Sequence, residues 1–143
     1  MNTIANSITT KEFYTTISVN RVLLLDDDSK LRSLIQRFLE AQFCTVVAVS
    51  NGVEGVRAVL KDDFDIVICD MMMPKMAGDK FYTAVERIRP DLCKRFLFIT
   101  GYQGNCEIND FINRVHGAML VKPFQVAELI ETIDSIQGRI ATR

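Results

Sequence analysis

Six polar residues able to bind a metal ion or a phosphoryl group follow directly on short apolar runs. They comprise four carboxylates, one hydroxyl and one ammonium group: Asp26, Asp27, Asp28, Asp70, Thr100 and Lys122. Two carboxylates about 4 Å apart repel by roughly 4 kcal/mol at an effective dielectric constant near 20, so a cluster of them needs a cation. Carboxylates, a backbone carbonyl and water suit Mg²⁺ or Mn²⁺, which takes phosphate oxygens as further ligands. The residue types therefore indicate one site for a divalent metal and a phosphoryl group.

Asp70 is the candidate nucleophile of such a site. It stands alone at the end of an apolar run, and a carboxylate is the attacking group in aspartyl-phosphate chemistry. Thr100 would offer a hydroxyl donor and Lys122 a positive charge to the equatorial phosphoryl oxygens. Phosphoryl transfer needs this kind of electrostatic stabilisation.

The elements that must position these residues are five short strands and the helices between them. The apolar runs are continuous rather than alternating, which is typical of strands covered on both faces of a parallel sheet. The predicted strands are 22–25, 46–49, 66–69, 96–99 and 119–121. Apolar residues at helical spacing predict helices over 31–39, 53–60, 81–88, 108–115 and 126–136. Asn51 is the expected cap of the second helix and Asp28 that of the first.

Strand and helix alternate five times, which predicts an α/β fold with an open, doubly wound, five-stranded parallel sheet in a single domain. In such a sheet the carboxyl ends of the strands share one edge, where ligands bind. The expected division is an N-terminal mobile arm over 1–20, the domain over 21–138 and a short tail over 139–143. The last helix is expected to stop near Gly138.

The composition excludes several other classes of protein. With 143 residues, 48% hydrophobic and 24% charged, the chain is long and apolar enough to fold without disulfide bonds or a structural metal ion. Its 17 basic and 18 acidic residues give a net charge of −1, which disfavours nucleic acid or an anionic membrane as a direct partner. No apolar stretch approaches the ~20 residues of a membrane span, and a cytoplasmic location is expected. The four cysteines are widely spaced and there is one histidine, which disfavours a zinc site.

Four strings in the chain resemble, in order and spacing, the receiver domain of two-component response regulators, including the chemotaxis regulators. They are VLLLDDDSKLR, DIVICDMMMPKMAG, FLFITG and MLVKPF, and the resemblance runs from about residue 21 to 137. It implies a flavodoxin-like fold with strand order 2-1-3-4-5. It also implies a signalling switch that turns over no external substrate.

The resemblance implies a role for each residue of the predicted site. Asp70 corresponds to the phosphoacceptor, and Asp26 and Asp27 to the acidic pair that positions Mg²⁺, with Asp27 the direct ligand and Asp26 often acting through water. The backbone carbonyl of Met72 would complete the protein ligands.

The resemblance assigns two further roles at the ends of the last two strands. Lys122 corresponds to the lysine that contacts the phosphoryl group, and its bond to Pro123 is commonly cis in this family. Thr100 corresponds to the switch hydroxyl.

The implied partners are a sensor histidine kinase or a histidine phosphotransfer protein as donor, and a downstream protein or a fused output domain as target. The segment 105–137 corresponds to the family's usual surface for docking or for a homodimer.

Three positions depart from the common family pattern. Met119 stands where Tyr or Phe is usual, so we expect a different or weaker coupling between Thr100 and the surface. Met72 and Tyr102 replace smaller polar residues, and we expect them to shield the acyl phosphate from water and lengthen its lifetime.

Three alternative functions stay open at this stage. A receiver-like module that binds partners without phosphorylation is favoured weakly by Met119. A phosphohydrolase of the haloacid dehalogenase type would need a second Asp two residues after Asp70, where Met72 stands. Flavin binding fits the fold, but the acidic loop after the first strand would repel the cofactor's phosphate.

Overall fold

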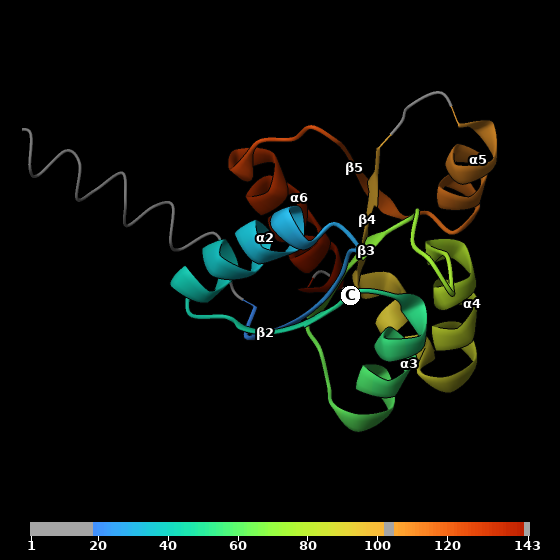
Figure 1. Cartoon of the computed structure of the whole chain (residues 1–143), viewed down its shortest axis with the longest axis horizontal. Helices are drawn as coiled ribbons and strands as arrows, with labels where there is room; N and C mark the ends of the chain where they lie inside the picture. Colours follow the sequence, from blue (N-terminus) through green and yellow to red (C-terminus); the bar gives the residue numbers. More distant parts are fainter. Residues whose placement is uncertain (1–18, 102–104, 142–143) are drawn as a thin grey trace, which may run out of the picture.

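The computed structural model describes residues 19–101 and 105–141 (Figure 1). The strands are β1 (Arg21–Leu25), β2 (Thr45–Val49), β3 (Ile66–Asp70), β4 (Phe96–Thr100) and β5 (Ala118–Val121). The α-helices are α2 (Ser29–Ala41), α3 (Gly52–Lys61), α4 (Gly78–Ile88), α5 (Cys106–Arg114) and α6 (Val126–Ala141), and a 3₁₀ helix, η1, spans Pro90–Arg95. The predicted alternation of strands and helices is therefore confirmed.

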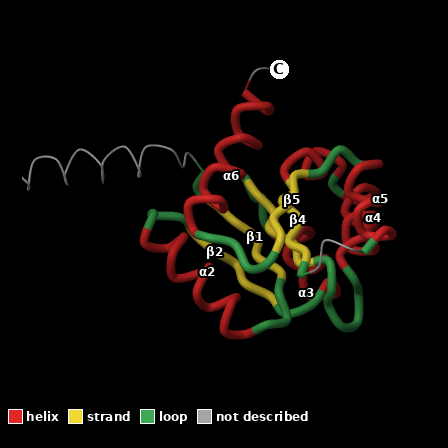
Figure 2. Tube along the Cα trace, turned by 90° about the horizontal axis from the view of Figure 1, so that it is seen from above, coloured by secondary structure: helices red, strands yellow, loops and turns green. Residues whose placement is uncertain are grey.

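All five strands pair in parallel, in the order β2-β1-β3-β4-β5. Helices α2 and α6 cover one face of this sheet, and α3, α4 and α5 cover the other (Figure 2). The predicted fold class and strand order are thus confirmed. None of the helices in the described ranges is long and apolar enough to cross a membrane.

The alternation of side chains along each strand divides the core into two clusters. Val22 and Leu24 of β1 point toward α2 and α6, whereas Leu23 and Leu25 point toward α3, α4 and α5. The cluster under α2 and α6 consists almost wholly of Val, Leu and Ile. The cluster under α3, α4 and α5 combines aliphatic residues and methionines with aromatic rings, which are those of Phe64, Phe81, Tyr82, Phe96, Phe98 and Phe111. Both faces of the sheet are therefore sealed by apolar packing.

Side-chain caps fix where three helices begin. The Asp28 carboxylate accepts hydrogen bonds from the backbone N–H of Lys30 at 3.0 Å and Leu31 at 3.2 Å, as expected. Asn51 accepts from the Glu54 N–H at 3.0 Å, and Asn105 caps α5 in the same way. Each cap pairs a backbone donor that the first helical turn leaves without a partner.

Two boundaries differ from the expectation. Helix α6 does not stop at Gly138 but continues to Ala141, because Ile136 is buried in the cluster under α2 and α6 and Ile140 packs against it. Gly138 is exposed and lies within this helix, and it weakens the helix by about 1 kcal/mol without ending it. Val19 is buried in the same cluster, so packing begins before residue 21, while residues 1–18 of the predicted arm lie outside the described residues.

Candidate functional site

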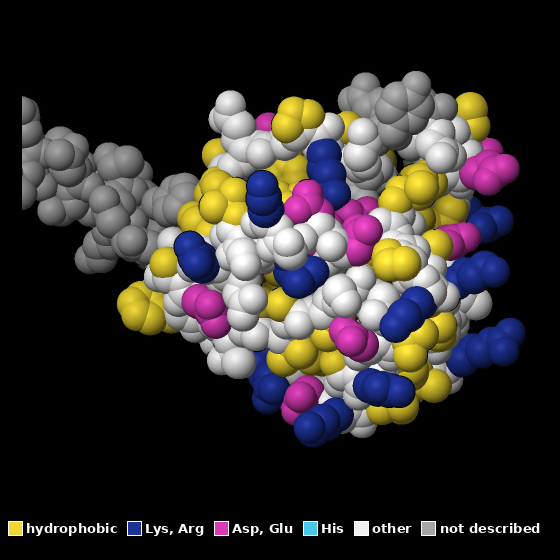
Figure 3. All heavy atoms as spheres, viewed as in Figure 1, with side chains coloured by type: hydrophobic (Ala, Val, Ile, Leu, Met, Phe, Trp, Pro, Cys, Tyr) yellow, Lys and Arg dark blue, Asp and Glu magenta, His cyan; other side chains and the backbone are white. Residues whose placement is uncertain are grey.

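The carboxyl ends of β1, β3, β4 and β5 meet at one edge of the sheet and bring the predicted site residues together (Figure 3, where magenta carboxylates gather beside dark-blue side chains). Asp26 follows β1, Asp70 ends β3 and Thr100 ends β4. Lys122 follows β5, and its backbone N–H donates to the Thr100 carbonyl at 2.7 Å. Parallel pairing thus assembles residues from four separate parts of the sequence.

Three carboxylates form the acidic part of this site. Asp26, Asp27 and Asp70 each offer an oxygen, and these oxygens all lie within 4.8 Å of one another. Asp26 and Asp70 are buried, with exposed fractions of 0% and 2%, whereas Asp27 is exposed. Hard oxygen donors with one side open to solvent fit Mg²⁺, which keeps several waters when it binds to proteins. The donor set therefore fits the predicted divalent metal.

Lys122 supplies the positive charge that lies closest to these carboxylates. Its Nζ atom is 2.7 Å from Asp70 Oδ2 and 3.6 Å from Asp26 Oδ2. Partial burial lowers the pKa of Lys122, but the hydrogen bond to Asp70 and the attraction of both carboxylates outweigh this and raise its pKa above the ordinary value. Lys122 is therefore held in its charged form.

The negative charge of buried Asp26 is only partly balanced by its hydrogen bond and by Lys122. Burial raises the pKa of Asp26 to about 6, and the charge of Asp70 adds to the rise, against the hydrogen bond from the Asp28 N–H. Its Oδ2 atom has no hydrogen-bond partner within the described part of the chain. A buried acceptor without a donor is costly, and a cation at this position would satisfy it.

Backbone N–H groups hold the two buried carboxylates in place, and one arginine holds the backbone after β1. Asp26 Oδ1 accepts from the Asp28 N–H at 2.9 Å, and Asp70 Oδ1 accepts from the Met72 N–H at 2.8 Å. The Arg32 guanidinium donates to the Asp26 carbonyl at 2.7 Å. Our sequence reasoning missed Arg32. The signal was its place in the first turn of α2, where a long side chain can reach back to the loop after β1.

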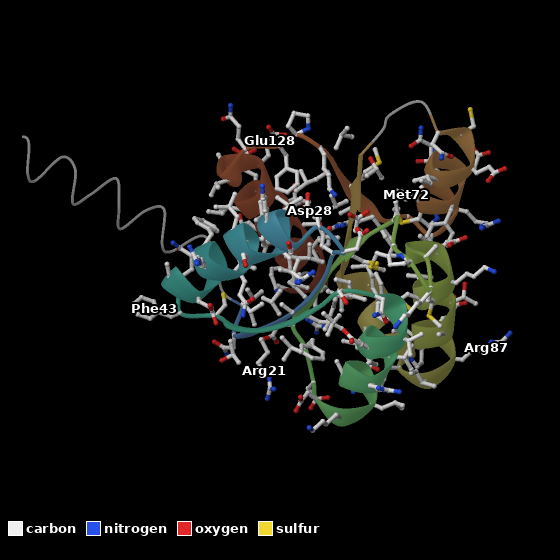
Figure 4. All side chains as sticks on the ribbon, in the orientation of Figure 1. Arg21, Asp28, Phe43, Met72, Arg87 and Glu128 are labelled. Carbon is white, nitrogen blue, oxygen red and sulfur yellow. The ribbon has the colours of Figure 1, made fainter. Side chains whose placement is uncertain are left out.

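Thr100 is fully buried, and its hydroxyl has no hydrogen-bond partner among residues 19–101 and 105–141. Met119 on β5 is 40% exposed and Met72 is 62% exposed, at the turn after β3 and on the same edge as Asp28 (Figure 4). Tyr102 lies outside the described residues. The Lys122–Pro123 peptide bond is cis, as predicted. Metal ligation by the Met72 carbonyl stays a prediction.

Three other side chains near the ends of these elements have different environments. Cys69 precedes Asp70 but points into the core under α3, α4 and α5 and is fully buried. His116 is exposed just after α5, with a positive φ of 56°. Asp28 serves as the cap of α2.

Comparisons with known proteins agree with this geometry. The family model described as "Response regulator receiver domain" matches residues 22–134. The probable transcriptional regulator ycf27 of Cyanidium caldarium is 29% identical over 130 residues, which cover 87% of this chain and 49% of that protein. The response regulator receiver protein CpdR of Brucella abortus (strain 2308) is 27% identical over 118 residues, covering 82% and 97%. The chain thus spans about half of one relative and nearly all of the other.

A solved structure shows the same fold. The response regulator protein TrrA from Thermotoga maritima, in complex with Mg(2+)-BeF, superposes with a TM-score of 0.72 at 23% identity. The match covers 82% of this chain and 98% of the TrrA chain.

Proposed function

The chain belongs to the response regulator receiver domain family of two-component signalling systems, and from this premise we propose that Asp70 accepts a phosphoryl group from a phosphohistidine on a partner protein. The transfer is Mg²⁺-dependent and changes a protein-interaction surface. The observation that carries the proposal is the buried Asp70 carboxylate, held 2.7 Å from Lys122 and within 4.8 Å of the oxygens of Asp26 and Asp27. Receiver domains are signalling modules rather than enzymes that turn over an external substrate.

The proposed transfer forms a bond between a carboxylate oxygen of Asp70 and phosphorus while the bond from phosphorus to the histidine nitrogen breaks. Asp27, Asp26, Asp70 and the Met72 carbonyl would hold the metal, which when bound neutralises charge on the phosphoryl oxygens. Lys122 then exchanges its hydrogen bond with Asp70 for one with a phosphoryl oxygen. The site is already arranged for the charge that the transfer develops, so little reorganisation is needed.

Thr100 is the proposed sensor of this event. Its buried hydroxyl lacks a partner within residues 19–101 and 105–141, and a phosphoryl oxygen on Asp70 would be an acceptor for it. When Thr100 moves, the Met119 side chain would move with it, at the position where the family usually has an aromatic ring. The coupling to the surface would be weaker, because a flexible thioether has many conformations. The test compares partner binding of phosphorylated wild type and Met119→Ala; equal responses would remove Met119 from the switch.

Met72 and Tyr102 are proposed to slow the loss of the phosphoryl group. Met72 stands two residues after Asp70, and its N–H already binds the acceptor carboxylate. A bulky apolar side chain at this mouth hinders the approach of water. Phosphate loss should therefore be faster from Met72→Asn than from wild type, and an unchanged rate would contradict this role.

The proposed donors are a sensor histidine kinase or a histidine phosphotransfer protein, with the protein in the cytoplasm. The target is a downstream protein or a fused output domain, and a homodimer through α5, β5 and α6 is a second outcome of the switch. Among the alternatives, a module that ignores phosphorylation is favoured only by Met119, and Met72 occupies the position where a phosphohydrolase of the dehalogenase type would need Asp.

The deciding experiment is incubation with acetyl phosphate and Mg²⁺, followed by intact-mass spectrometry. Wild type should gain one phosphoryl group, and Asp70→Ala should gain none. The matched control Asp134→Ala removes an exposed carboxylate of α6 and should behave like wild type. Beryllofluoride with Mg²⁺ provides a second readout through a spectral change. No phosphoryl gain in wild type, or the same gain in Asp70→Ala, would contradict the proposal.

A further inference from the structure

A groove of about 500 Å³ lies between α4 and α5 and shares no residue with the acidic site. Thr83 and Ala84 of α4 line it, and both are small; we call this part of the groove its floor. Ile88 of α4, 39% exposed, gives the groove apolar surface, and Phe111 of α5, which is 7% exposed and packs in the core, also lines it. Thr83, Ala84 and Ile88 recur at helical spacing, so they line one face of α4. The groove therefore offers a strip of apolar contact along a helix.

Three basic side chains surround this apolar strip: Lys80 and Arg87 of α4 and Arg114 of α5. In the described part of the chain none of the three forms an ion pair. Arg114 instead lies 5.7 Å from the ring centre of Phe111. Figure 4 shows Arg87 pointing away from the body of the protein, and Figure 3 shows dark-blue and yellow side chains along this side.

A single carboxylate, Asp79, also lines the groove. Its Oδ1 atom accepts a hydrogen bond from the backbone N–H of Lys80 at 2.9 Å, in the first turn of α4. Its charge is thus directed to the start of the helix, where the helix dipole favours it. The groove keeps an excess of positive charge although the whole chain has a net charge of −1.

We propose that the groove between α4 and α5 binds an acidic, amphipathic helical segment of a partner protein. An apolar side chain of that segment would lie on Thr83 and Ala84, and its carboxylates would pair with Arg87 and Arg114. An amphipathic helix in a groove is a common mode of peptide recognition, and opposite charges favour both the rate and the orientation of docking. A nucleic acid fits less well, since the floor is apolar and Asp79 repels phosphate.

The probe for the test is a fluorescein-labelled helical peptide with leucines on one face and glutamates on both flanks. Fluorescence anisotropy measures its binding to the full chain. We expect saturable binding that weakens with salt, and much weaker binding of the same peptide with lysines in place of glutamates. Equal binding of the two peptides, or no binding of the acidic one, would overturn the proposal.

Two variants locate the binding. The double variant Arg87→Glu/Arg114→Glu should lose affinity by about 10-fold or more, because like charges then face each other. The matched control Arg37→Glu reverses an exposed charge on α2, across the sheet, and should bind like wild type. Thr83→Tyr fills the floor without changing charge and should also weaken binding. Circular dichroism checks that each variant is folded.

The other occupants are outcomes of the same experiment. A single-stranded oligonucleotide that competes for the groove with higher affinity than the acidic peptide would overturn the proposal in favour of nucleic acid. Sedimentation that shows a dimer lost in Arg87→Glu/Arg114→Glu would overturn it in favour of a second copy of the chain. Wild-type affinity in that double variant would exclude the groove altogether.

Discussion

The acidic site and the apolar core beneath it lie side by side but contribute to the stability of the fold with opposite sign. In the core, Phe98 is fully buried and contacts the rings of Phe96, Tyr82 and Phe111 at centroid distances of 5.4, 5.9 and 5.6 Å. In the site, Asp26 Oδ2 and the Thr100 hydroxyl are equally buried but lack hydrogen-bond partners in the described part of the chain. The core therefore stabilises the fold, while the site lowers stability in exchange for groups that are ready to bind.

The largest effect is expected from Phe98→Ala, which tests the core side of this comparison. Truncating a buried aromatic ring removes its packing and leaves a cavity, and we expect the free energy of unfolding to fall by about 3–5 kcal/mol. Urea denaturation followed by circular dichroism measures it. Phe43→Ala is the matched control, because Phe43 is 90% exposed and should change stability by less than about 0.5 kcal/mol. Similar losses in both variants would contradict the comparison.

A smaller effect, an increase in the free energy of unfolding, is expected from Asp26→Asn. The native pKa of about 6 exceeds the ordinary value of 3.8, so the folded state holds the proton more tightly than the unfolded state. The free energy of unfolding of wild type should therefore fall as pH rises between these values and stay low above them.

Asp26→Asn lacks this carboxylate, and its unfolding free energy should exceed that of wild type above pH 6 by up to about 3 kcal/mol, since one pKa unit corresponds to 1.36 kcal/mol. Chemical denaturation in metal-free buffer across this pH range measures both proteins. If the unfolding free energy of Asp26→Asn falls with pH as that of wild type does, the pH dependence belongs to another group.

The smallest effect is expected from Thr100→Val, which replaces a buried hydroxyl that has no partner in the described ranges with a methyl group. We expect the free energy of unfolding to rise by about 1 kcal/mol, because the cost of desolvating the hydroxyl disappears. Thr132→Val is the matched control, since the Thr132 hydroxyl donates to the Glu128 carbonyl at 2.7 Å and its loss should bring no gain. Thermal unfolding compares the two; equal shifts would show that the unpaired hydroxyl costs nothing.

The comparison also explains how much was predictable from the sequence. The core strands are continuous apolar runs, and Asp70 or Thr100 directly after such a run belongs to the edge where parallel strands end. The alternation of strands and helices therefore predicted the edge where these residues gather, whereas the strand order was implied only by the resemblance to receiver domains. Asp28 and Asn51 were equally readable as caps, because their role depends on residues only two or three positions away.

Features that depend on distant contacts were not readable. The Arg32 bond to the Asp26 carbonyl spans only six residues, but it was missed too, because a basic residue in a first helical turn has many other uses. Helix α6 passes Gly138 because Ile140 packs on the core, which outweighs the local preference of glycine. The 3₁₀ helix η1 buries Leu92, but its sequence has no regular apolar spacing that would predict this helix. The groove between α4 and α5 joins residues about 30 positions apart, which no single helical pattern shows.

The position of Lys122 has a consequence for newly made protein. A polypeptide emerges from the ribosome amino end first, so the stretch bearing Asp26 and Asp70 is made before Lys122, which follows β5. Strand β5 completes the sheet beside β4, and only then do the opposed charges meet. The order of synthesis therefore delays the pairing of Lys122 with Asp26 and Asp70 until β5 has been translated.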